Sequence, residues 1–260
     1  MKFRAAREWR LGALLSPSGT GAAPAVLMLH GFPGVLKNED IAAELCRRGL
    51  TVFMPYYGGC WGSPGRFSVR GAFDDARTAL RLLSRYRQVD ARRIGIFGYS
   101  LGGWAALRVA SEQPLAAVAV LAPAVPHGNE SGDARYLRRH AKAVNIASLR
   151  GAWEEYAAEA RRDRPERYIP LISPAPLLIV QGLKDRLVPP DLTAGLWAHA
   201  PQPKKLVAFP DEDHEFQKDR PAVTAMVCGW LESRLRRPAP SRLLSSTAVL
   251  QEECLPANHR

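Results

Sequence analysis

The fold is decided by residues 93–104, which read RIGIFGYSLGGW. A short apolar strand, Ile94 to Phe97, runs into the pattern G-x-S-x-G and then into a helical pattern. In that context Ser100 lies on a sharp strand-to-helix turn, where a base and a carbonyl can both reach its hydroxyl. Gly98 and Gly102 flank it because side chains there would collide as strand and helix approach. We interpret Ser100 as a nucleophile, and the alternative is an ordinary glycine-rich turn.

Outward from this stretch, short apolar runs alternate with helical patterns along the chain. The alternation predicts an α/β fold, a mostly parallel sheet with helices on both faces. The predicted strands are 25–30, 51–54, 94–97, 115–121, 177–181 and 205–209, and the predicted helices are 39–48, 69–86, 101–112, 190–199 and 220–235. Two apolar stretches at the start, 3–6 and 9–15, are not separated by a helix, so we expect an antiparallel hairpin at the sheet edge.

One interval, residues 126–173, breaks the alternation. It is polar and rich in arginine, but Tyr136, Trp153 and Tyr156 argue against disorder. We expect a helical cap over the active-site end of the sheet, and the alternative is a peripheral helical insertion. The pattern as a whole predicts one catalytic domain over 1–237. Residues 238–260 begin Pro-Ala-Pro-Ser and show weak periodicity, which predicts a flexible tail.

Composition excludes several classes of function. Of 260 residues, 47% are hydrophobic, yet no apolar run is long enough to span a membrane. The first 15 residues lack the apolar core of a secretory signal, so we expect a cytoplasmic protein. The formal net charge of +11 is scattered among acidic residues and accompanies no nucleic-acid motif, which favours a solvated arginine-rich surface over an anion-attracting face. The four cysteines, far apart in sequence, predict reduced thiols and no metal.

A serine nucleophile needs a base and a group that orients the base. Of six histidines, His214 is best placed, because it follows the last predicted strand in the loop PDEDHEF. The acid should come from the loop after the preceding strand, where Asp185 is the carboxylate in the turn; Asp191 is better explained as a helix N-cap. A surface histidine and a plain turn aspartate are the alternatives. The order Ser100, Asp185, His214 is typical of an α/β-hydrolase.

An oxyanion formed during attack by Ser100 needs two backbone N–H groups. Leu101, at the helix N-terminus just past the serine, is one candidate donor. The second should come from the loop His30-Gly31-Phe32-Pro33-Gly34, where Pro33 has no N–H, so Phe32 is the better candidate. His30 then shapes this loop and does not act in catalysis.

Together these segments resemble the α/β-hydrolase superfamily from Ala25 to about Arg236. The stretch YGGCWGSPGRF, residues 57–67, is similar to small bacterial carboxylesterases, dienelactone-hydrolase-like proteins and the catalytic domains of prolyl-oligopeptidase-type peptidases. The resemblance implies an α/β-hydrolase fold with a serine hydrolase site. One departure is Glu215, at a position where related sequences usually have a small residue after the histidine.

These observations predict a serine hydrolase that cleaves short-chain carboxylic esters through an acyl-enzyme. The expected partner is a small-molecule ester, and we expect no binding to nucleic acid or membrane. No metal or organic cofactor is implied. Trp61 and Trp153 are candidate substrate contacts. The alternatives are a prolyl-oligopeptidase-like peptidase, a thioesterase or acyltransferase, and a catalytically silent binding protein. Fewer than 30 residues precede His30, which leaves no room there for the propeller of the peptidases and favours an ester. Ser100 at the elbow disfavours dehalogenase and epoxide hydrolase chemistry, which uses Asp.

Overall fold

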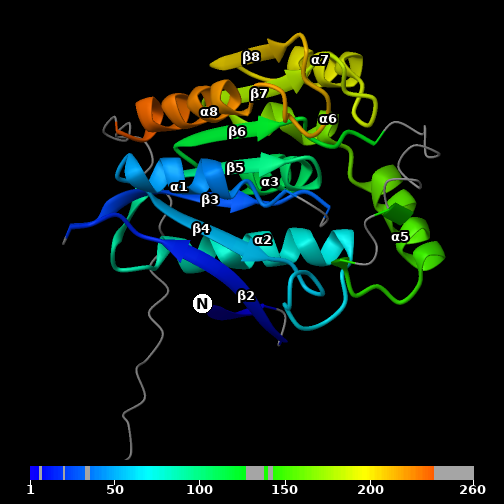
Figure 1. Ribbon diagram of the computed structural model, residues 1–260, viewed down its shortest axis with the longest axis horizontal. Coiled ribbons are helices and arrows are strands. Elements are labelled where there is room, and N and C mark those ends of the chain that lie inside the picture. Colours follow the sequence, from blue (N-terminus) through cyan, green and yellow to red (C-terminus); the bar gives the residue numbers. More distant parts are fainter. Residues whose placement is uncertain (6–7, 20, 33–35, 127–137, 140–142, 237–260) are drawn as a thin grey trace, which may run out of the picture.

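A computed structural model describes residues 1–236 except 6–7, 20, 33–35, 127–137 and 140–142. Its centre is one eight-stranded sheet in the order β1-β2-β4-β3-β5-β6-β7-β8 (Figure 1). Strands β3 to β8 run parallel to one another, whereas β1 and β2 are antiparallel to their neighbours. The strands are β1 Lys2–Ala5, β2 Glu8–Leu15, β3 Ala23–Leu29, β4 Thr51–Tyr56, β5 Val89–Tyr99, β6 Ala117–Leu121, β7 Leu177–Gly182 and β8 Lys204–Phe209. The predicted α/β class and the edge hairpin are confirmed.

Helices cover both faces of this sheet. The helices are α1 Glu39–Arg47, α2 Val69–Ser84, α3 Leu101–Glu112, α5 Leu149–Arg162, α6 Pro165–Tyr168, η2 Ile169–Ile172, α7 Pro190–His199 and α8 Arg220–Leu235. Helices α1 and α8 pack together on one face, and α2 and α3 pack together on the other. Figure 1 shows α1 and α8 in front of the central strands.

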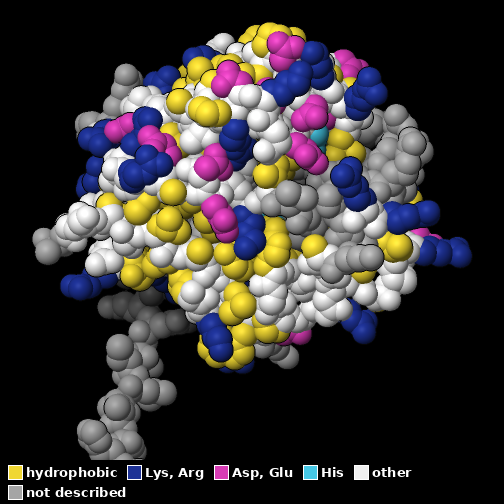
Figure 2. Space-filling model, viewed as in Figure 1, with side chains coloured by type: hydrophobic (Ala, Val, Ile, Leu, Met, Phe, Trp, Pro, Cys, Tyr) yellow, Lys and Arg dark blue, Asp and Glu magenta, His cyan; other side chains and the backbone are white. Residues whose placement is uncertain are grey.

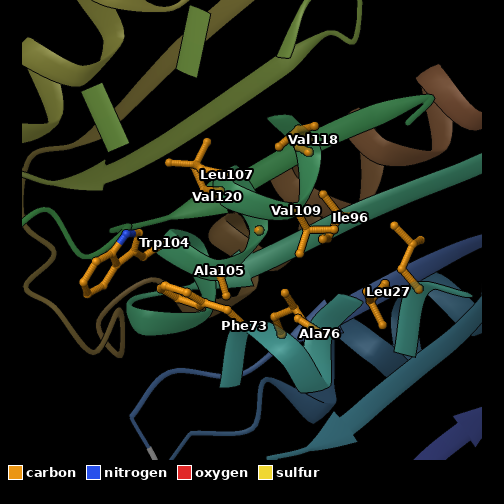
Figure 3. Close-up of a cluster of buried hydrophobic side chains, with 14 of the residues drawn as sticks. Leu27, Phe73, Ala76, Ile96, Trp104, Ala105, Leu107, Val109, Val118 and Val120 are labelled. Atoms are coloured by element: carbon orange, nitrogen blue, oxygen red, sulfur yellow. The ribbon is translucent and has the colours of Figure 1, made fainter. Parts of the chain in front are cut away.

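The central strands are buried on both faces because their side chains alternate between two cores. In β3, Leu27 and Leu29 pack toward α2 and α3, and Val26 and Met28 pack toward α1 and α8. Figure 3 shows the first core, where Phe73, Ala76 and Trp104 meet strand residues such as Leu27, Ile96 and Val118. This rigid centre fixes the positions of the loops at the carboxyl ends of the strands.

A buried ion pair ties the edge hairpin to the loop after β4. The guanidinium Nε of Arg10, in β2, lies 2.9 Å from Oδ2 of Asp75 in α2. The same carboxylate oxygen accepts the backbone N–H of Gly58 over 2.8 Å, and Nη1 of Arg10 donates to the carbonyl of Pro64 over 3.2 Å. Both charged side chains are almost fully buried, so each depends on the other to offset its desolvation.

The inserted segment, residues 143–173 of the predicted cap, contains α5, α6 and η2. Helix α5 begins at Ser148, whose hydroxyl accepts the backbone N–H of Gly151 over 3.0 Å. Figure 1 places α5 beyond the ends of the central strands, where β5 leads into α3. The predicted flexible tail, 238–260, and Tyr136 lie outside the described residues.

Basic and acidic side chains are interspersed on the face of the molecule in Figure 2. Many of the arginines are paired: Arg77 bonds to Glu112 over 2.6 Å and Arg220 to Asp40 over 2.7 Å. In the described part of the chain, no helix combines the length and the apolar character needed to cross a membrane.

Candidate active site

Ser100 is held on a strained turn between β5 and α3. Its backbone is left-handed, with φ 52° and ψ −119°, a conformation that costs free energy for a residue with a side chain. A Cβ at Gly98 would overlap the backbone of Gly102, and a Cβ at Gly102 would overlap the carbonyl of Leu29. Ser100 donates its backbone N–H to Leu121 over 3.0 Å, and its carbonyl accepts the N–H of Ala124 over 2.9 Å. The backbone hydrogen bonds of Ser100 and the close packing at Gly98 and Gly102 therefore hold the predicted turn in this conformation.

The structure brings Ser100, His214 and Asp185 into one chain of hydrogen bonds. The Nε2 atom of His214 lies 3.0 Å from Oγ of Ser100, and its Nδ1 lies 2.8 Å from Oδ2 of Asp185. All three residues are nearly buried. Because an ionised carboxylate only accepts hydrogen bonds, Nδ1 carries the imidazole proton, which leaves Nε2 free to accept the serine proton.

The other oxygen of Asp185 is occupied by backbone groups of its own turn. Oδ1 accepts the N–H of Leu187 over 2.9 Å and that of Val188 over 2.8 Å. Asp185 thus divides its two oxygens between the turn and the histidine. The other acids near the site have different partners: Asp211 pairs with Lys184 over 2.5 Å, and Oδ1 of Asp213 accepts the N–H of Glu215 over 3.0 Å.

The prediction for Asp191 needs a correction. Pro189 is the N-cap of α7, and Asp191 lies inside the first helical turn without a side-chain capping bond. Pro190 occupies the first helical position, where the fixed φ of proline matches the helical backbone. Asp191 instead places its negative charge at the positive end of the helix dipole.

The loop that carries His214 is fastened by residues that the sequence analysis did not identify. Tyr99 donates its hydroxyl to the carbonyl of His214 over 2.9 Å. Buried Glu212 accepts the backbone N–H groups of Lys218 and Asp219 with its carboxylate, and its carbonyl accepts the N–H of Lys184 over 2.9 Å. Tyr99 directly precedes Ser100, but nothing in the sequence indicates that its hydroxyl bonds to the loop of His214, and an acid in an acidic loop, such as Glu212, gives no signal either.

His30 links the loop after β3 to the loop after β4. Its Nε2 accepts the backbone N–H of Tyr57 over 3.2 Å, so Nδ1 carries the proton and donates to the carbonyl of Gly31 over 2.7 Å. Burial lowers the pKa of His30 to about 3, because a buried imidazolium loses its hydration. His30 is therefore neutral at physiological pH and shapes the loop, in agreement with the sequence analysis.

The two predicted oxyanion donors, Phe32 and Leu101, belong to segments that adjoin Ser100. Leu101 is the first residue of α3, where backbone N–H groups have no partner within the helix. Gly31 packs so closely against the elbow that a Cβ would lie 3.2 Å from Cβ of Ser100. Phe32 follows it, and its ring meets Phe67 edge-on at 5.2 Å. Residues 33–35 of this loop are not among those described.

Of the two tryptophans predicted to contact substrate, Trp61 lies beside His30, at the start of the loop that carries Gly31 and Phe32. Its ring centroid is 4.4 Å from that of His30, and the Lys37 ammonium lies 5.1 Å from the Trp61 centroid. Trp153, on α5, stacks on Tyr156 at 5.4 Å, and Tyr156 meets Trp104 edge-on at 6.0 Å. Trp153 therefore contacts α3, the helix after Ser100, only indirectly, through Tyr156.

A cavity of about 460 Å³ opens beside His214. Glu215, the residue that departs from the pattern of related sequences, is half-buried at its edge. The lining is strongly charged and consists of Lys184, Arg186, Leu187, Asp211, Asp213, His214, Glu215 and Lys218.

The described residues contain no cluster of three or more His, Cys, Asp or Glu side chains suited to hold a metal ion. The thiols of Cys46, Cys60 and Cys228 are free. Burial raises the pKa of Cys228 to about 12, so this thiol stays protonated and unreactive.

Comparison with known proteins places this site in a family. Residues 56–237 match the model of the prolyl oligopeptidase family. The chain is 32% identical to uncharacterized protein Rv2307c of Mycobacterium tuberculosis over 252 residues, which cover 93% of this chain and 77% of that protein. It is 30% identical to uncharacterized peptidase YtmA of Bacillus subtilis over 187 residues, which cover 68% of this chain and 69% of YtmA. Est1E from Butyrivibrio proteoclasticus, solved with ferulic acid bound, superposes with a TM-score of 0.75 at 19% identity, covering 91% of this chain and 100% of Est1E.

Proposed function

We propose that this chain, which belongs to the prolyl oligopeptidase family and has the α/β-hydrolase fold, cleaves short-chain carboxylic esters through an acyl-enzyme on Ser100. The observation that carries the proposal is the continuous chain of hydrogen bonds from Ser100 through His214 to Asp185. A buried serine hydroxyl facing an imidazole that is itself oriented by a carboxylate is the arrangement that activates a serine for acyl transfer.

In the proposed reaction, Oγ of Ser100 attacks the ester carbonyl while Nε2 of His214 takes the hydroxyl proton. The backbone N–H groups of Phe32 and Leu101 stabilise the negative oxygen of the tetrahedral intermediate. His214 then gives its proton to the departing alcohol, and the acyl group stays on Ser100. Water attacks the acyl-enzyme by the same steps, with His214 again as base and then as acid.

Asp185 holds the imidazole in the tautomer and orientation that these steps require. It accepts from Nδ1 throughout and stabilises the imidazolium that forms during attack. Because His214 protonates the leaving group, the leaving group should lie on the His214 side of the site, toward the charged cavity. Trp61 and Trp153 are proposed contacts for the acyl group.

A serine peptidase is the second candidate, because the matching family is the prolyl oligopeptidase family and YtmA is described as a peptidase. The same three residues serve ester and amide cleavage. An amide is the harder substrate, since its nitrogen must be protonated before it can leave, so amide hydrolysis demands closer positioning of the leaving group.

The test begins with a fluorophosphonate probe, which reacts with activated serines. We expect labelling of the wild-type protein at Ser100 and none of Ser100→Ala, whose thermal unfolding should match the wild type. Hydrolysis of p-nitrophenyl butyrate within about tenfold of wild type in Ser100→Ala would rule out nucleophilic catalysis by this residue. If aminoacyl or prolyl amides exceed p-nitrophenyl butyrate in kcat/KM, the peptidase is the correct assignment.

A further inference from the structure

A buried amide lies beneath the turn that carries Asp185. Gln181, near the end of β7, is 2% exposed. Its Nε2 atom lies 3.0 Å from the carbonyl oxygen of Gly182, 3.0 Å from that of Val188 and 3.4 Å from Oδ2 of Asp185. Three acceptors surround this atom, which identifies it as the amide nitrogen, since the amide oxygen would be repelled by all three.

The opposite end of the same amide is fixed by helix α7. Thr193, which is fully buried, donates its hydroxyl to Oε1 of Gln181 over 2.8 Å. This bond determines which end of the amide faces the turn. Thr193 and Gln181 therefore connect α7 to the turn that supplies Asp185.

The two strong bonds of Gln181 close the turn at both ends. Gly182 enters the turn and Val188 leaves it, and both carbonyls accept from the single Nε2 atom. Val188 is shared, because its N–H donates to Oδ1 of Asp185 while its carbonyl accepts from Gln181. A shift of the Gln181 amide would therefore move the backbone group that holds Oδ1.

The third contact of Gln181 reaches the oxygen that faces the histidine. Oδ2 of Asp185 accepts from Nδ1 of His214 over 2.8 Å, and the amide nitrogen lies on the other side of this oxygen at 3.4 Å. The bond is long, but in a buried site the positive end of the amide dipole still favours a carboxylate oxygen at this position.

We propose that Gln181 and Thr193 are positioning residues for the acid of the site: they fix the turn 182–188 so that Asp185 presents Oδ2 to His214. Neither touches the reacting atoms. The inference rests on the proposed function, in which Asp185 orients the imidazole.

The experiment compares Gln181→Met and Thr193→Val with the wild type, using p-nitrophenyl butyrate. Met keeps much of the length and volume of Gln but offers no hydrogen bond to the turn, and Val replaces the Thr hydroxyl by a methyl group. We expect kcat to fall about three- to tenfold in each variant, the effect of a lost or misdirected hydrogen bond, with KM unchanged.

A double-mutant cycle separates positioning from general stabilisation. If Gln181 acts through Asp185, the Gln181→Met substitution should have almost no further effect on kcat in the Asp185→Asn background. A merely structural role would lower kcat by the same factor in both backgrounds, and that result would overturn the proposal.

Thr51→Val is the matched control. Thr51 is also buried, but its hydroxyl has no hydrogen-bond partner among the described residues, so its loss should leave kcat unchanged. Thr193→Val tests the proposal even where Gln181→Met does not fold, and an unchanged kcat in Thr193→Val would contradict it. Absence of turnover in the wild type would instead refute the proposed esterase function, and the two failures are thereby distinguished.

Discussion

The indole N–H of Trp104 donates to Oδ1 of Asp163 over 3.2 Å. Trp104 lies one turn after Ser100 in α3, and its own backbone N–H donates to the carbonyl of Ser100 over 3.1 Å. Asp163 is the C-cap of α5 and also pairs with Arg108 over 3.4 Å. The inserted segment is therefore bonded to α3, the helix that begins directly after Ser100.

Trp104→Phe should weaken this connection, because it removes the N–H and keeps an aromatic ring. Trp230→Phe is the control, since the indole N–H of Trp230 has no partner in the described part of the chain. Both substitutions lose ring volume, but only the first loses a hydrogen bond. We expect the free energy of unfolding in urea to fall about 1 kcal/mol further for Trp104→Phe. Equal losses in the two variants would show that the bond contributes nothing.

Asp185→Asn should lower kcat by on the order of 10³ to 10⁴ with little change in KM, because an amide at this position favours the wrong imidazole tautomer. Asp191→Asn and Asp213→Asn should stay close to wild type, since one carboxylate lies in the first turn of α7 and the other bonds to the N–H of Glu215. Steady-state kinetics with p-nitrophenyl butyrate check this. A silent Asp185→Asn beside a crippled Asp213→Asn would reassign the acid.

His30 should make the folded state sensitive to acid. Its pKa is lowered from 6.5 to about 3 on folding, so between these values the unfolded chain binds a proton that the folded protein does not. The free energy of unfolding must therefore fall as the pH falls through this window.

For this one group the loss between pH 7 and pH 5 should be about 2 kcal/mol. His30→Gln removes the titrating ring, so its stability should vary less over the same range, whatever its absolute value. Chemical denaturation at both pH values gives the two differences. Parallel pH dependence in wild type and variant would mean that His30 does not carry the effect.

Trp153→Ala tests the proposed acyl contact. If the Trp153 ring borders the acyl group, its loss should favour longer chains, because more space becomes available for apolar groups to leave water. We expect wild-type kcat/KM to peak among the short p-nitrophenyl esters, and the peak to move to longer chains in the variant. The substitution should affect stability less than Trp104→Phe does, since Trp153 is only half-buried. An unchanged chain-length profile would remove Trp153 from the site.

The positions of Ser100, Asp185 and His214 were predictable because each follows an apolar strand. In a parallel sheet all carboxyl ends lie at one edge, so strand assignment alone brings these loops together. Strand boundaries were harder to predict. β5 begins at Val89, whereas the sequence predicted a start at Ile94. The early part of the strand was missed because it is polar and exposed, with Asp90 paired to Arg92 and Arg93. Where charged residues pair with one another along a strand, the alternation of apolar and polar residues that predicts a strand is absent.

The supports of the site were not predictable from local sequence. Gln181 and Thr193 meet across 12 positions, and Tyr99 reaches His214 across 115. Neither pair shows a spacing or motif that distinguishes its members from other polar residues of the chain. Such partners become visible only when the sheet and its helices are packed, since burial is what makes their hydrogen bonds obligatory.

The pair of Arg10 and Asp75 bears on how this protein can be recombined with its relatives. The region that matches the family model starts at residue 56, so it includes Asp75 and excludes Arg10. A chimera joined at that point to a relative that lacks an arginine at position 10 would bury the carboxylate without its guanidinium, at a cost of about 3–5 kcal/mol. A crossover that keeps residues 8–75 from one parent preserves the pair, so the edge hairpin should be exchanged together with the region that matches the family model.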